Sequence, residues 1–146
     1  MTETDTVHAS AVALDDCGLL ILGPAGSGKS TLAIEMIAMG AELVADDMVA
    51  LSAKGGEIIA EAAPGARGQI EARNVGILTC PLREGAVKVD LVVDLGAEEA
   101  DRLPFVEFYE HAGGKARKLR KAPSLTASAL VLALHHGGPI DPDAEE

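Results

Sequence analysis

Aromatic side chains and basic charge are both scarce in this chain of 146 residues. Tryptophan is absent, Tyr occurs once and Phe twice, and the 12 Lys and Arg face 23 Asp and Glu, which gives a formal net charge of −11. Proteins bind single-stranded nucleic acid with aromatic platforms, and every nucleic acid attracts basic surfaces. We therefore expect no nucleic-acid partner, and a core built from Leu, Val, Ile and Ala.

Cysteines are also few, and long apolar runs are missing. Cys17 and Cys80 lack the spacing of metal ligands, so we expect them to pack as small apolar groups. No apolar run reaches the length that crosses a membrane. The first five residues, MTETD, are acidic where a signal peptide is basic. These features predict a cytoplasmic chain with no membrane partner.

Short β-like segments dominate the rest of the sequence. The length predicts one domain over residues 1–146, with disordered polar tails at 1–6 and 139–146. Helices are predicted just after residues 23–31 and over 126–135. The fold class is α/β, a compact β-rich domain with one main helix after residues 23–31. Strands are predicted at 7–14, 18–22, 43–45, 48–51, 57–62, 75–79 and 87–94.

The most specific motif is a glycine-rich stretch that fits G-x-x-x-x-G-K-[ST]. A short apolar run precedes it and a helix-forming run follows it, which is the strand–loop–helix setting of a P-loop. In such a loop the backbone N–H groups and the helix N-terminus bind phosphates. Lys29 is expected to reach the outer phosphates and Ser30 to bind Mg²⁺. The predicted nucleotide-binding residues are Gly23, Pro24, Ala25, Gly26, Ser27, Gly28, Lys29, Ser30 and Thr31.

Two adjacent carboxylates, Asp46 and Asp47, end the apolar run that follows the predicted helix. Such a pair is often a solvated strand end or a helix cap, but beside a P-loop it is a candidate for general-base chemistry. The residues alone leave three functions open. The first is a protein kinase, and the second is a P-loop kinase or NTPase that acts on a small molecule. The third is a nucleotide-binding regulatory module.

Five segments together resemble the catalytic domain of HPr kinase/phosphorylase, the bacterial enzyme that phosphorylates a serine of the phosphocarrier HPr. The resemblance covers about residues 7 to 135. The segments are Val7-His8, the P-loop, Leu43-Val44-Ala45-Asp46-Asp47, the run from Ile70 to Ile77 (IEARNVGI), and Asp101-Arg102-Leu103. The resemblance implies the fold of the HPr kinase and phosphoenolpyruvate carboxykinase group. It also implies an ATP- and Mg²⁺-dependent serine kinase of the phosphotransferase system, acting on HPr or a paralogous phosphocarrier.

The resemblance also implies roles for single residues. Asp47 would be the general base for the serine hydroxyl, and His8 would lie near it. Ser30 and Glu71 would bind Mg²⁺. Arg102 either stabilises charge on the transferred phosphoryl group or is an ordinary exposed surface arginine, because the Asp-Arg match is short. Arg73 either orders the loop after Glu71 or forms a structural salt bridge.

Some positions depart from the family pattern. Ala9, Ala25 and Asn74 replace Gly, Ser and Gly, although Asn tolerates a positive φ. The family segment used for dephosphorylation is poorly matched by residues 119–124, which predicts weak phosphorylase activity. The basic run at 115–121 is either a solvated face or a docking patch. The family forms hexamers through its catalytic domain, so homo-oligomerisation is left open.

Overall fold

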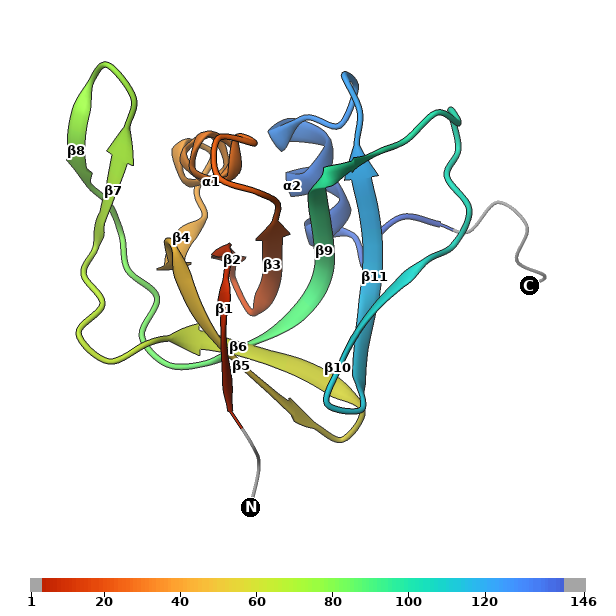
Figure 1. Cartoon of the computed structure of the whole chain (residues 1–146), viewed down its shortest axis with the longest axis horizontal. Coiled ribbons are helices and arrows are strands. Elements are labelled where there is room, and N and C mark those ends of the chain that lie inside the picture. The colour runs from red at the N-terminus through yellow and green to blue at the C-terminus, as the bar shows by residue number, and fades with distance from the viewer. Residues whose placement is uncertain (1–3, 141–146) are drawn as a thin grey trace.

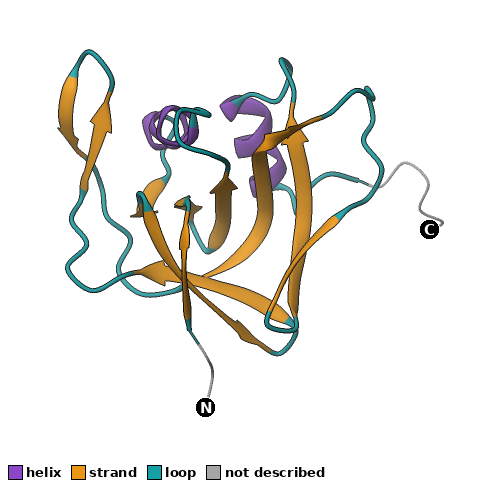
Figure 2. Cartoon of the chain, viewed as in Figure 1, coloured by secondary structure: helices purple, strands orange, loops and turns teal. Residues whose placement is uncertain are grey.

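The computed structural model describes residues 4–140 of the chain as one mixed α/β, sheet-rich domain with two helices in that range (Figures 1 and 2). Of the tails predicted at 1–6 and 139–146, residues 1–3 and 141–146 lie outside the described residues. The elements are β1 (Asp5–His8), β2 (Ser10–Leu14), β3 (Cys17–Leu22), α1 (Lys29–Ala38), β4 (Glu42–Ala45), β5 (Met48–Lys54), β6 (Glu57–Ala62), β7 (Gln69–Ala72), β8 (Gly76–Thr79), β9 (Val87–Glu98), β10 (Phe108–His111), β11 (Gly114–Lys121) and α2 (Ala127–His135).

Nine of these strands form one curled sheet. Its main path has the order β1-β5-β6-β9-β3-β2-β4, and β11 pairs with β9 and carries β10 on its other side. The strands β3 and β9 are parallel, and the Leu22 position pairs with that of Asp94. Parallel strands end at the same edge of a sheet. The chain therefore leaves β3 for the P-loop beside the end of β9 that carries Asp94.

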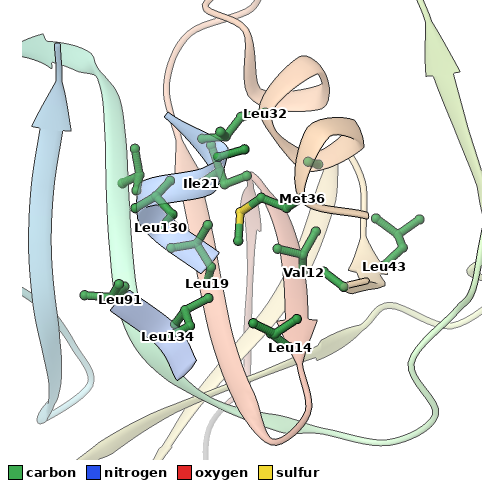
Figure 3. Packing of buried hydrophobic residues seen from close by; sticks show 14 of the residues in the cluster. Val12, Leu14, Leu19, Ile21, Leu32, Met36, Leu43, Leu91, Leu130 and Leu134 are labelled. Atoms are coloured by element: carbon green, nitrogen blue, oxygen red, sulfur yellow. The ribbon is translucent and has the colours of Figure 1, made fainter. Parts of the chain in front are cut away.

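The curled sheet has an apolar core on each of its faces. Side chains alternate between faces along a strand, so Leu19 and Ile21 point to the side of the helices while Leu20 points to the other side. Figure 3 shows the helix side, where Met36 of α1 and Leu130 of α2 lie over strands β2, β3 and β9. The second core contains Val49, Ile58 and Val92. The buried residues of both cores are aliphatic side chains and Met, as the scarcity of aromatic residues predicts.

Both helices begin and end as their sequences indicate. Helix α1 buries Leu32, Ala33 and Met36 on one face, and Gly40, with a φ of 110°, follows its last turn. Helix α2 starts after Thr126, whose Oγ1 accepts a hydrogen bond from the N–H of Ala129 at 3.3 Å. Neither helix is long and apolar enough to cross a membrane.

Three expectations from the sequence need correction. Asp5 and Thr6 are not part of a frayed tail, because β1 pairs them with Leu51 and Ala50 of β5. The predicted strand over 7–14 is two strands, which separate at Ala9. Strands β10 and β11 were not predicted, because the basic run of β11 has a low strand propensity. Its ladder with β9 supplies the missing stabilisation.

Candidate active site

The glycine-rich loop connects β3 to α1, with its backbone in conformations that glycine favours (Figure 1). Gly28, the residue before the helix, has a φ of 103°, in the region that other residues rarely adopt. Gly23 is restricted by space as well, because a Cβ there would lie 2.5 Å from the Oγ of Ser27. The backbone of the loop thus favours glycine at positions 23 and 28. The predicted order of strand, loop and helix is present.

The first turn of α1 has the electrostatics of an anion site. No side chain caps the helix, and its first turn carries no acidic residue. The N–H groups of that turn have no partner within the helix. The Lys29 Nζ donates hydrogen bonds to the carbonyl oxygens of Gly23 at 2.7 Å and Pro24 at 3.1 Å. Its ammonium therefore lies over the loop, where it can exchange these carbonyls for phosphate oxygens.

Asp46 is joined directly to the P-loop. Its Oδ1 accepts a hydrogen bond from the Oγ of Ser30 at 3.0 Å and one from the Oγ of Ser10 at 2.7 Å. Among residues 4–140, Ser10 is the one polar residue that is buried. It is 1% exposed and lies in β2, whose other residues are apolar. Ser10 was not among the predicted site residues, and its one visible signal is that it is a lone polar residue within an otherwise apolar run. These two hydroxyls fix the orientation of the Asp46 carboxylate.

The Asp46 carboxylate also affects a nearby thiol. Burial raises the pKa of Cys80 above its usual value, and the negative charge of Asp46 raises it further. Cys17 and Cys80 are both free and partly buried against the core on the helix side, as expected for small apolar groups. A thiol held protonated beside Asp46 adds no further negative charge to this end of β4.

Asp47 lies in the turn between β4 and β5, and His8 is the last residue of β1, which pairs with β5. The N–H of Ala9 donates to the carbonyl oxygen of Asp47 at 3.2 Å, and the position of His8 pairs with that of Met48. Asp47 has a φ of 74°, a conformation that Asp tolerates better than most residues. Both side chains are exposed. The structure thus brings the backbones of these two predicted site residues together at the β1–β5 edge.

Glu71 and Arg73 belong to a separate hairpin of β7 and β8, which stands beside α1 (Figure 1). Ile70 anchors the hairpin in the core on the helix side, and Asn74 at its turn has a φ of 68°, as its place in the family pattern predicts. Within the described part of the chain, neither Glu71 nor Arg73 forms an ion pair or a side-chain hydrogen bond. The structure therefore joins Ser30 to Asp46 by a hydrogen bond, and Glu71 has no such bond to either of them.

Arg102 is exposed in the loop between β9 and β10, and no ion pair or side-chain hydrogen bond involves it among residues 4–140. The basic run is largely engaged within the fold. Arg120 donates two hydrogen bonds to Glu107, at 2.6 and 2.8 Å, and Lys118 lies 3.7 Å from the same side chain. The Lys115 Nζ lies 4.4 Å from the centre of the Phe108 ring. Three of the five cations of the run are thus engaged within the fold, which leaves fewer of them for a docking patch.

Comparison with known proteins gives a consistent set of relatives. A family model described as the HPr Serine kinase C-terminal domain matches residues 1–103. The HPr kinase/phosphorylase of Alkaliphilus metalliredigens is 38% identical over 102 residues, which cover 65% of this chain and 33% of that protein. The HPr kinase/phosphorylase of Thermoanaerobacter sp. is 32% identical over 132 residues, which cover 83% of this chain and 42% of that protein. The chain thus spans well under half of the length of these two relatives.

A solved structure has the same fold. The HPr(Ser) kinase/phosphatase from Coxiella burnetii superposes with a TM-score of 0.73 at 23% identity, over 88% of this chain and 92% of that one. The similarity includes most of the described elements. It confirms a mixed α/β, sheet-rich domain with two helices, and it extends beyond the residues that the family model matches.

Proposed function

The chain belongs to the family of HPr serine kinase C-terminal domains, and on this basis we propose that it is a protein-serine kinase that transfers the γ-phosphoryl group of ATP to HPr or a paralogous phosphocarrier. The observation that carries the proposal is the hydrogen bond between Ser30 of the P-loop and Asp46 of the acidic strand end. This bond places a hydroxyl, a carboxylate and a phosphate-binding loop in one site, as phosphoryl transfer requires.

The residues present fit ATP. The loop from Gly23 to Thr31 would bind the phosphates through its N–H groups, because the α1 terminus is uncapped and carries no acid. Lys29 would hold the outer phosphates, since its ammonium already lies at the loop. Its charge offsets the negative charge that develops on the transferred group.

The residues also fit Mg²⁺, a hard cation that prefers oxygen ligands and neutralises charge on the phosphates. Ser30 and Asp46 offer a hydroxyl and a carboxylate 3.0 Å apart. We assign this pair as the primary protein ligands, with Glu71 as a further ligand carried by the β7–β8 hairpin. Within residues 4–140, no cluster of three or more His, Cys, Asp and Glu is formed, so phosphate and water oxygens would complete the shell.

The carboxylate of Asp47 is our general base for the acceptor hydroxyl. It is exposed, whereas that of Asp46 is half-buried and bonded to two serines, so Asp47 is free to accept a proton from an incoming serine. His8 ends strand β1 opposite Met48, the residue after Asp47, and would orient that carboxylate. Arg102 would stabilise the transferred group only if the β9–β10 loop folds toward the P-loop when substrates bind.

The reverse reaction, release of the phosphoryl group to inorganic phosphate, is proposed to be weak. The segment that would serve it, residues 119–124, matches the family pattern poorly, and Arg120, one of its two cations beside Lys121, is paired with Glu107. We place the reaction in the cytoplasm, where HPr and ATP occur together. We also propose that the domain, residues 1–146, can form a homo-oligomer, as its family does.

Transfer of radiolabel from ATP to purified HPr in the presence of Mg²⁺ tests the proposal. We expect labelled HPr with the wild type, none with Lys29→Ala, and normal labelling with the matched control Lys54→Ala, whose side chain lies in the β5–β6 hairpin. Binding of ATP without label on HPr would instead favour a nucleotide-binding module. Label on a small metabolite would favour a small-molecule kinase.

A further inference from the structure

A groove of about 390 Å³ lies beside Asp46. One of its walls is the turn between β4 and β5, which contributes Asp46 and Met48. The opposite wall is the loop from β6 to β7, which contributes Pro64, Arg67 and Gln69. Asp46, whose carboxylate is bonded to the P-loop, and Arg67 thus line the same groove from two different segments of the chain.

The loop that carries Arg67 has a fixed backbone. The N–H of Ala66 donates to the carbonyl oxygen of Ala63 at 3.2 Å, and the N–H of Cys80 donates to that of Gly68 at 2.9 Å. A Cβ on Gly68 would lie 2.6 Å from the carbonyl oxygen of Cys80, so only glycine fits there. These contacts on both sides hold the Cα of Arg67 at the rim of the groove.

The guanidinium of Arg67 is not used within the fold. It is exposed and has no ion pair among residues 4–140, whereas Arg83 pairs with Asp16 and Arg120 with Glu107. Leaving a guanidinium unpaired beside a groove costs little in water and keeps it available for a ligand. Its planar set of donors matches the oxygens of a phosphate ester.

A phosphorylated acceptor needs such a cation. The product carries a phosphate ester close to Asp46 and Asp47, in a chain with a net charge of −11, and those carboxylates repel it. Lys29 lies on the P-loop and serves the nucleotide. Among the residues that line the groove, Arg67 is the cation on the acceptor side.

We propose that this groove is the acceptor-side phosphate site and that Arg67 binds the phosphoryl oxygens of the phosphoserine formed on the acceptor. The inference rests on the proposed kinase function and adds a residue to it. Arg67 is a binding residue for the product and for the phosphoryl group as it reaches the acceptor.

The direct test is a titration with O-phosphoserine, followed by NMR, on protein saturated with ADP and Mg²⁺ so that the P-loop is filled. We expect wild type to bind O-phosphoserine and not serine, with shifts in the loop at 63–69. Arg67→Gln should weaken this binding by about tenfold, as loss of a charge-assisted bidentate contact does. Lys54→Gln removes one positive charge at the far end of β5 and should bind like the wild type.

Three results would overturn the inference. They are the absence of O-phosphoserine binding by the ADP-loaded wild type, equal binding by Arg67→Gln, and equal weakening by Lys54→Gln. Label transfer to HPr separates this inference from the proposed function. If the wild type transfers label to HPr and Arg67→Gln binds O-phosphoserine normally, the kinase function is supported and the phosphate site at Arg67 is excluded. O-phosphoserine binding that depends on Arg67, without transfer to HPr, keeps the site and removes the kinase assignment.

Discussion

The Oγ of Ser30 and the Oδ1 of Asp46 lie 3.0 Å apart although 16 positions separate them in the chain. Ser30 belongs to the first turn of α1, and Asp46 follows the last residue of β4. The same carboxylate oxygen accepts a hydrogen bond from the Ser10 hydroxyl of β2, at 2.7 Å. Three elements thus meet at one oxygen atom. The roles that we propose for the two adjacent carboxylates follow from this contact, because Asp46 is bonded to the P-loop and Asp47 forms no side-chain hydrogen bond among residues 4–140.

These proposed roles predict different effects for the two amide variants. Asp47→Asn cannot accept the serine proton, so phosphoryl transfer should fall by roughly 10²-fold with an unchanged Mg²⁺ requirement. Asp46→Asn is a poorer ligand for a hard cation, so the Mg²⁺ concentration for half-maximal transfer should rise. Label transfer to HPr across a Mg²⁺ titration measures both effects. An unchanged requirement in Asp46→Asn, with a raised one in Asp47→Asn, would reverse the two roles.

Glu71→Gln tests whether the β7–β8 hairpin contributes a metal ligand. Because an amide binds Mg²⁺ more weakly than a carboxylate, we expect a higher Mg²⁺ requirement than in the wild type and a smaller change than in Asp46→Asn. The measurement is the same titration of transfer against Mg²⁺. Glu110→Gln, on the exposed side of β10, is the matched control and should titrate like the wild type. A Glu71→Gln curve that overlays the control would leave Ser30 and Asp46 as the protein ligands.

The packing of α1 on the sheet predicts a contrast between two methionines. Met36 is fully buried between α1 and the strands (Figure 3). Met39, in contrast, is 47% exposed. Met36→Ala should lower the free energy of unfolding by about 2–5 kcal/mol, because it leaves a cavity in the core. Met39→Ala should change it by no more than about 0.5 kcal/mol. Urea unfolding followed by circular dichroism checks both values, and equal losses would contradict the packing described for α1.

The ion pair of Arg120 and Glu107 predicts a pH dependence of stability. Two hydrogen bonds from Arg120 lower the pKa of Glu107. A carboxyl whose pKa is lower in the folded state stabilises the fold above the usual glutamate range, about pH 4.3. That contribution is lost as the pH falls through the folded-state pKa. At neutral pH, the urea concentration at the midpoint of unfolding should therefore be higher for the wild type than for Glu107→Gln. The difference should shrink on acidification, and a constant difference from pH about 7 to about 3 would exclude this origin.

The sequence by itself determined the features that depend on neighbouring residues. The P-loop between a strand and a helix is one of them, because its glycines, Lys29 and Ser30 follow one another in the chain. The end of α1 before Gly40, the Thr126 cap of α2 and the positive φ of Asn74 are others. Each follows from local backbone preference and from the period of apolar residues. The short apolar runs, and the partial alternation over residues 87–94, also predicted many of the strands of the sheet.

Only the tertiary structure decided which distant residues meet. Strands β10 and β11 are basic or mixed in sequence and exist because β9 offers β11 a ladder of hydrogen bonds. The buried Ser10, the bond between Asp46 and Ser30, and the groove shared by Asp46 and Arg67 depend on the curl of the sheet. A sequence pattern records propensity and spacing along the chain. The distance between two side chains depends on how the strands are ordered and how far the sheet bends, because pairing across the fold is set by burial and by the satisfaction of backbone hydrogen bonds.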